Sequence, residues 1–182
     1  MSIQYAETAL LLAGRTLLRR PLNNGGAGFS DKECQIEADE MAPAVVGDLY
    51  VVLMPGGFRP GPRHNTSGGV YDLIYGLDVL VARRTGNVPR DRYLATLEAL
   101  NAEVDRVITA LDFDATNQLL QVANQLIREK TGTQDSFIEP LKFAGVDKRP
   151  KPAPGSFFGG TSTKAGIMRG VFFQGARLVT AR

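Results

Sequence analysis

The 182-residue chain has one cysteine, one histidine and no tryptophan. A single cysteine cannot form a disulfide within the chain, and a secreted protein of this size with 20 glycines would usually carry several. Cys34 therefore indicates a reducing compartment. A single histidine, His64, excludes a metal centre built from several histidines and a pair of histidine acid–base groups.

The sequence also has little net charge and no long hydrophobic run. Its 21 basic and 19 acidic residues leave a net charge of +2. This balance does not favour attraction of nucleic acid by the whole surface, so any DNA contact would be local. No run approaches the roughly 20 apolar residues that cross a bilayer. No basic region precedes the apolar stretch 9–13, so we expect neither a membrane span nor a signal peptide.

The composition that remains is typical of a folded protein. Hydrophobic residues make up 43% of the chain and charged residues 22%, well away from the disordered range. A chain of this length fits one ordinary domain with a sizeable core. We expect residues 1–182 to form a single domain with long loops at 21–35, 55–69 and 147–166.

Apolar residues recur at helical spacing in three segments, 3–20, 93–111 and 116–130. Asp91 and Asp114 are the expected N-caps of the second and third helices, and Gly132 is the expected end of the third. The second helix should bury one apolar stripe, consisting of Leu94, Leu97, Leu100, Val104, Val107, Ile108 and Leu111.

Strands are predicted where β-branched and aromatic residues gather or where apolar residues alternate. The expected strands are a short one at Cys34–Ala38, one at 48–54 ended by a turn at Pro55–Gly57, one at 70–82, an edge strand at 136–143 containing Pro140, and a final strand from Gly166 interrupted by Gly175. Segment 148–156 reads as an extended connector. This order predicts an α+β fold: a mainly antiparallel sheet packed against two or three helices, with long loops.

Three features resemble catalytic or ligand-binding motifs. The glycine-rich run 157–166 lacks the spacing of a phosphate-binding loop, and Cys34 has no nucleophile context. The carboxylates of Asp72 and Asp78, and of Glu37, Asp39 and Glu40, would suit a divalent cation or glycosidase chemistry. A solvated or interface-facing strand surface explains them better. We therefore predict no catalytic residue, no cofactor, no metal site and no enzymatic activity.

A basic feature is more suggestive. The loop 56–69 carries Arg59, Arg63 and His64, and the end of the following strand carries Arg83 and Arg84, with Arg90 and Arg92 close behind. Arginines on extended segments suit phosphates or the carboxylates of a neighbouring subunit. Because no aromatic residues interleave with them, we favour subunit contacts over DNA binding. These five residues, Arg59 to Arg84, are the candidate subunit or DNA-lumen contacts.

The layout resembles that of the tail terminator, or tail completion, proteins of tailed bacteriophages. The resemblance is carried by an N-terminal helix, the segment GDLYVVLMPGG, the long strand VYDLIYGLDVLVARR, the helix RYLATLEALNAEVDRVITAL and the closing segment GIMRGVFFQGARLVTAR. It covers about three quarters of the chain as a pattern of elements. The helix at 116–130 and the connector KRPKPAP are longer than the compact family pattern.

The resemblance implies a virion protein, made in the host cytoplasm, that forms a sixfold ring. That ring would cap the tail tube, stop its polymerisation and dock the tail on the capsid neck, with DNA passing through the lumen. Its partners would be copies of itself and the tube and neck or connector proteins. The loop 56–69 would be a candidate contact with the tube, the lumen or the next ring.

Other functions remain open. A different head–tail connector, neck or tail tube subunit would share this layout. A small DNA-binding protein is less favoured because the charge is balanced. A nuclease or glycan hydrolase acting through carboxylates would need several convergent acids, and the sequence offers only scattered ones.

Overall fold

The computed structural model describes residues 3–20, 28–36, 47–60, 70–85, 90–111, 118–132 and 142–180. Within these residues the order of elements is α1 (Ile3–Arg19), β1 (Cys34–Ile36), β2 (Leu49–Pro60), β3 (Val70–Arg84), α2 (Arg90–Leu111), α3 (Gln118–Thr131), β4 (Lys142–Val146), β5 (Lys151–Ala153), the short 3-10 helix η1 (Gly155–Phe158) and β6 (Gly166–Thr180). None of these helices is long and apolar enough to cross a membrane.

Six strands form one sheet in the order β1-β2-β3-β6-β4, and β5 pairs with a further part of β6. Only β1 and β2 are parallel, and all other pairs are antiparallel. Strands β3 and β6 pair along their whole length, from Val70 opposite Thr180 to Arg84 opposite Gly166. The predicted α+β fold with a mainly antiparallel sheet is confirmed.

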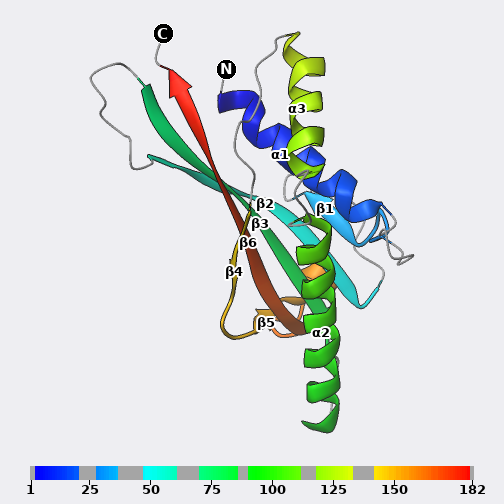
Figure 1. Ribbon diagram of the computed structural model, residues 1–182. Coiled ribbons are helices and arrows are strands. Elements are labelled where there is room, and N and C mark those ends of the chain that lie inside the picture. The colour runs from blue at the N-terminus through cyan, green and yellow to red at the C-terminus, as the bar shows by residue number, and fades with distance from the viewer. Residues whose placement is uncertain are drawn as a thin grey trace.

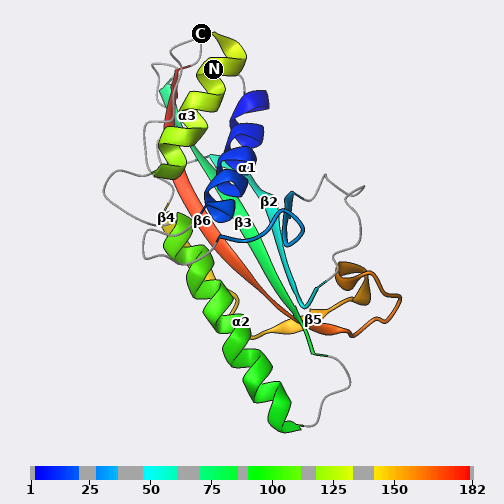
Figure 2. The same cartoon turned by 90° about the vertical axis from the view of Figure 1, so that its right-hand side faces the viewer.

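The helices lie on one face of this sheet (Figures 1 and 2). Alternate residues of β3, from Tyr75 to Val81, point to that face and are buried, as the period of two predicts. Helix α1 approaches the sheet closely at Gly14, where a Cβ atom would lie 2.6 Å from Leu53 Cδ2. The main core therefore lies between the three helices and the strands β2, β3 and β6.

A second, smaller core lies on the opposite face of the sheet. Ala82 of β3, Ala153 of β5 and Phe158 of η1 are buried there, and Tyr50 packs against them. The segment after β4 thus covers the far end of that face. The prediction that residues 148–156 form only a connector is wrong. This segment contains β5, which pairs with β6, and the start of η1.

The prediction of a loop at 55–69 is also wrong for residues 55–60. Strand β2 continues through Pro55–Gly57 to Pro60, with a bulge between Pro55 and Phe58. Glycine is required here: Gly57 has φ 73°, and a Cβ on Gly56 would lie 2.6 Å from the backbone carbon of Gly76. The expected turn is therefore a bulge inside a strand, and residues 61–69 lie outside the described part of the chain.

Three other boundaries differ from the prediction. Gly175 does not interrupt β6, because it pairs with Tyr75 in an unbroken ladder. The edge strand β4 begins at Lys142, so most of the predicted strand at 136–143, including Pro140, lies outside the described residues. The loops predicted at 21–35 and 147–166 are shorter than expected, because they contain the start of β1 and all of β5 and η1.

Helix ends confirm one expectation and correct another. Gly132 ends α3 with φ 66°, and its N–H donates to the Arg128 carbonyl at 2.9 Å, as a helix-terminating glycine does. Helix α2 begins at Arg90, so Asp91 lies within its first turn and is not the N-cap. Asp114 and Ala38 lie outside the described residues.

Candidate functional site

The structure separates the arginines that the sequence grouped together. Arg59 pairs with Ile74, whereas Arg83 and Arg84 lie nine and ten residues further along β3. Nine residues of strand span roughly 30 Å. Arg59 therefore lies at one end of the sheet and the Arg83–Arg84 pair at the other, while Arg63 and His64 lie outside the described residues.

Arg84 points to the face opposite the helices, where it has a structural partner. Its Nη2 donates to the carbonyl oxygen of Phe158 at 2.8 Å, and its guanidinium lies 5.5 Å from the centre of the Phe158 ring. A charged donor on a backbone carbonyl and a cation above an aromatic ring each stabilise the fold. Arg84 thus fastens η1 to the end of β3.

Arg83 points to the helix face and lines a cavity of about 310 Å³. The other lining residues are Asp48, Arg84, Arg92, Ala95, Thr96 and Ala99. The Nε atom of Arg83 is buried without a hydrogen-bond partner among the described residues. The small side chains Ala95 and Ala99 lie one helical turn apart on one face of α2. This cavity presents cationic groups that an anion could contact.

At the other end of the sheet, Arg59 is exposed, and its Nη2 donates to Gln174 Oε1 at 3.1 Å. The two side chains lie on β2 and β6, so their bond spans β3 on the face away from the helices. This hydrogen bond leaves other donors of the guanidinium for a partner.

The carboxylates do not form a metal site within the described residues. No group of three or more histidine, cysteine or acidic side chains gathers there. Asp78 stands on the face opposite the helices, where burial raises the pKa of its carboxyl group. The side chain of Asp72 is outside the description, as are Glu37, Asp39 and Glu40.

Cys34 is fully buried at the start of β1. Burial raises the pKa of its thiol to about 12, against the opposing effect of the Arg19 guanidinium. Arg19 Nη2 also donates to the Cys34 carbonyl at 2.6 Å, and Arg19 Nη1 forms an ion pair with Asp31. The thiol is therefore protonated at neutral pH and belongs to the core.

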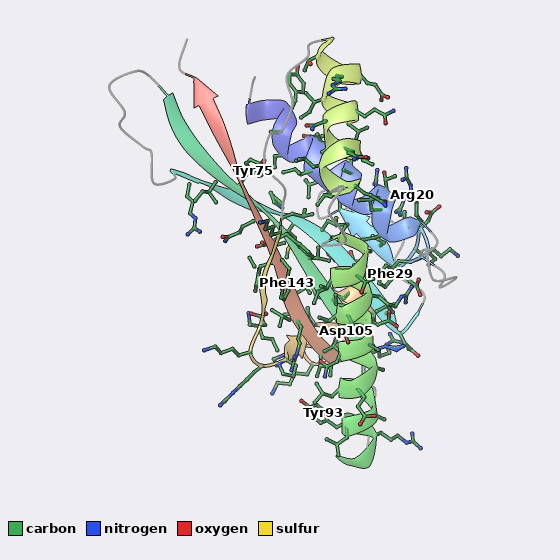
Figure 3. All side chains as sticks on the ribbon, in the orientation of Figure 1. Arg20, Phe29, Tyr75, Tyr93, Asp105 and Phe143 are labelled. Atoms are coloured by element: carbon green, nitrogen blue, oxygen red, sulfur yellow. The ribbon has the colours of Figure 1, made fainter. Side chains whose placement is uncertain are left out.

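The first turns of α2 extend past the end of the sheet in both Figure 1 and Figure 2. Tyr93 lies on this projecting part (Figure 3), and Leu94 follows it in the helix. Their side chains are 40% and 60% exposed. We call residues 92–94 the α2 tip. The predicted apolar stripe of α2 is therefore wrong at Leu94, because the sheet that buries Leu100, Val104 and Val107 ends before the helix does.

A groove lies between α1 and α3, near the opposite end of the molecule from the α2 tip. Its volume is about 310 Å³, and most of its lining is apolar. We call it the α1/α3 groove, and it is lined by Tyr5, Thr8, Ala9, Leu12, Leu126, Ile127, Glu129 and Lys130. Neither the groove nor the exposure of the α2 tip follows from helical periodicity, since both depend on where the helices cross the sheet.

No protein-family model matches this chain, and no curated protein matches it significantly.

Proposed function

We propose that the chain is a structural virion protein that forms a ring, terminates the phage tail tube and joins the tail to the capsid neck. The observation that carries this proposal is a three-stranded extension of the sheet whose outer strands have unpaired edges among the described residues. We call it the arm: residues 54–60 of β2, 70–78 of β3 and 175–180 of β6.

Pairing along the arm stops on both outer sides. Strand β1 pairs only with residues 51–53 of β2, and β4 pairs only with residues 171–174 of β6. Beyond these points, the described residues of β2 and β6 have a strand neighbour only in β3. An exposed strand edge is a template on which another chain can add a strand.

The shape of the arm supports contact with a neighbour. Its tip reaches away from α3 in Figure 1. The sheet face opposite the helices carries three apolar side chains that are only partly buried: Ile74 on the arm, and Leu80 and Phe172 beyond it towards the middle of the sheet. Since β5 and η1 cover only the far end of that face, a partner that covers it would bury more apolar surface.

Such an arm suits a subunit that must join unlike structures. Within the proposed ring, one set of surfaces binds the neighbouring copies, while the arm binds the tail tube or the neck. The order of elements supports the same function, since the structure has the N-terminal helix, the long central strand, the following helix and the closing strand on which the resemblance to tail terminators rests. A head–tail connector or neck subunit is the alternative within this class.

Contact with DNA in the lumen is part of the proposal. Arg83 supports it best, because its side chain lines an open cavity and its Nε has no hydrogen-bond partner among the described residues. Phosphate contacts weaken steeply with salt. Weak binding of duplex DNA that falls with salt, and that Arg83→Gln reduces, is expected; salt-independent binding or none would remove DNA contact from the proposal.

Tube capping tests the function directly. The purified chain is added to polymerising tail tube protein of the same phage, and tube lengths and tube ends are recorded by electron microscopy. We expect shorter tubes with a ring at one end. Tubes that elongate unchanged, with the chain absent from their ends, would contradict the terminator function; rings that bind purified neck proteins instead would favour the connector alternative.

A further inference from the structure

We propose that the α2 tip of one copy inserts into the α1/α3 groove of the next copy, and that this contact builds the ring. The inference rests on the proposed ring for its biological meaning, but it concerns a contact that is measurable without any tail component. Its first support is an exposed apolar pair, Tyr93 and Leu94, on a helix end that projects beyond the sheet.

The groove and the tip complement each other in chemistry. The tip presents one aromatic and one branched aliphatic side chain, and the groove offers an apolar space of about 310 Å³ between two helices. A tyrosine that enters a water-excluding pocket is a typical anchor of a protein interface.

The charges at the rims are complementary as well. Beside the apolar pair, α2 carries Arg92 and, one turn beyond Leu94, Glu98, and both are exposed. The groove carries Glu129 and Lys130, also exposed. Glu129 accepts a hydrogen bond from Gln125 Nε2 at 2.8 Å and keeps acceptor capacity for a guanidinium. Rim charges of this kind set orientation and partner choice more than affinity.

The α2 tip of one copy cannot reach the α1/α3 groove of the same copy. The α2 tip and the upper parts of α1 and α3 lie at opposite ends of the molecule in Figures 1 and 2. The contact therefore joins two different patches on two copies, which is a heterologous interface. A heterologous interface closes into a ring when its rotation closes and otherwise gives an open filament.

Engineered cysteines test the contact. Cys34→Ala supplies a background without the native thiol, and Leu94→Cys and Leu12→Cys are introduced into separate chains. Cysteines can join only when their Cα atoms approach within about 7 Å. We expect a disulfide-linked dimer when the two proteins are mixed and oxidised, and little from either protein alone. No mixed dimer, or a faster one from Leu94→Cys alone, would overturn the inference.

A second pair of variants avoids reliance on crosslinking. Tyr93→Ala removes an exposed ring from the tip, and Phe143→Ala is the matched control, because Phe143 is a similarly exposed aromatic residue on β4. Tyr93→Ala should raise the concentration at which copies associate at least tenfold, whereas Phe143→Ala should leave it within twofold. Equal effects of the two variants would overturn the inference.

These results separate the contact from the proposed function. Rings that form without the mixed crosslink would contradict the α2 tip contact and leave the ring intact. A mixed crosslink together with unaltered tail tubes would support the contact and contradict the terminator function.

Discussion

At the scale of residues, the side chains that the sequence marked as chemical candidates have different structural roles. Arg84 is fastened to Phe158, Cys34 is buried in the core, and Arg83 faces a cavity. The two arginines are neighbours in sequence but point to opposite faces, because successive side chains of a strand alternate. The alternation is readable from the sequence, whereas the partner of each arginine depends on what covers each face.

The thiol of Cys34 predicts how stability changes with pH. Its pKa is raised from 9.0 to about 12 by burial, so the folded chain keeps a proton that the unfolded chain releases. The stabilisation is complete below the unfolded pKa and is lost as pH rises from 9.0 towards about 12. The loss attributable to this thiol approaches about 1.4 kcal/mol per pH unit.

Urea unfolding of the wild type and of Cys34→Ala across this pH range measures the effect. The wild type should lose stability with a steeper pH slope than the variant, and the difference in slopes isolates the thiol from other groups that titrate there. Parallel slopes would mean that burial does not raise the pKa of this thiol.

Replacing Arg84 should lower the stability of the fold and leave the association of copies unchanged. Arg84→Ala removes the bond to the Phe158 carbonyl and the contact with its ring, which together should cost about 1–2 kcal/mol. Lys164→Ala, at an exposed position, should change stability by less than about 0.5 kcal/mol. Thermal unfolding measures both, and association unchanged in Arg84→Ala would place this residue in the fold rather than in a subunit contact.

At the scale of elements, periodicity predicts the interiors of the elements better than their ends. The alternation in β3 and the apolar stripe of α2 from Leu97 onwards are both found in the structure. Gly175 and the proline-rich segment before η1 are paired in the sheet, although their residue types favour breaks. Pairing with β3 and β6 overrides those local preferences. Which strands pair cannot be predicted from the local residue pattern.

The candidate site was predictable only in part. The sequence identified the arginines, yet their separation by roughly 30 Å follows from the register of β2 with β3. The spacing of Leu94 predicts that it belongs to the buried stripe of α2. It is exposed because α2 extends beyond the end of the sheet. The α1/α3 groove depends on how two helices distant in sequence pack together, which periodicity does not specify.

The arm makes a prediction of its own. Arg59→Glu reverses an exposed charge on the arm, and Lys148→Glu makes the same change at an exposed position beyond β4. If the arm binds the tube or neck, Arg59→Glu should weaken tube capping at least several-fold and leave ring formation unchanged. Capping assays with both variants measure this, and an equal effect of Lys148→Glu would show general charge dependence instead of an arm contact.

At the scale of the whole molecule, the features of this chain fit a part of an assembly. An extended sheet carries unpaired edges among its described residues, one sheet face keeps partly exposed apolar side chains, and a helix tip projects with Tyr93 and Leu94 exposed. In a single copy these surfaces stay exposed or only partly buried. Packing against neighbours would bury them, and the arm and the α2 tip would then serve different neighbours.

We propose that copies of this chain form a closed ring, and the mass of the purified protein in solution tests this most directly. Light scattering across a range of concentrations, with and without tail tubes, measures that mass. We expect one discrete closed species, a hexamer by the resemblance, either alone or on meeting tail tubes. A strict monomer under both conditions would contradict it.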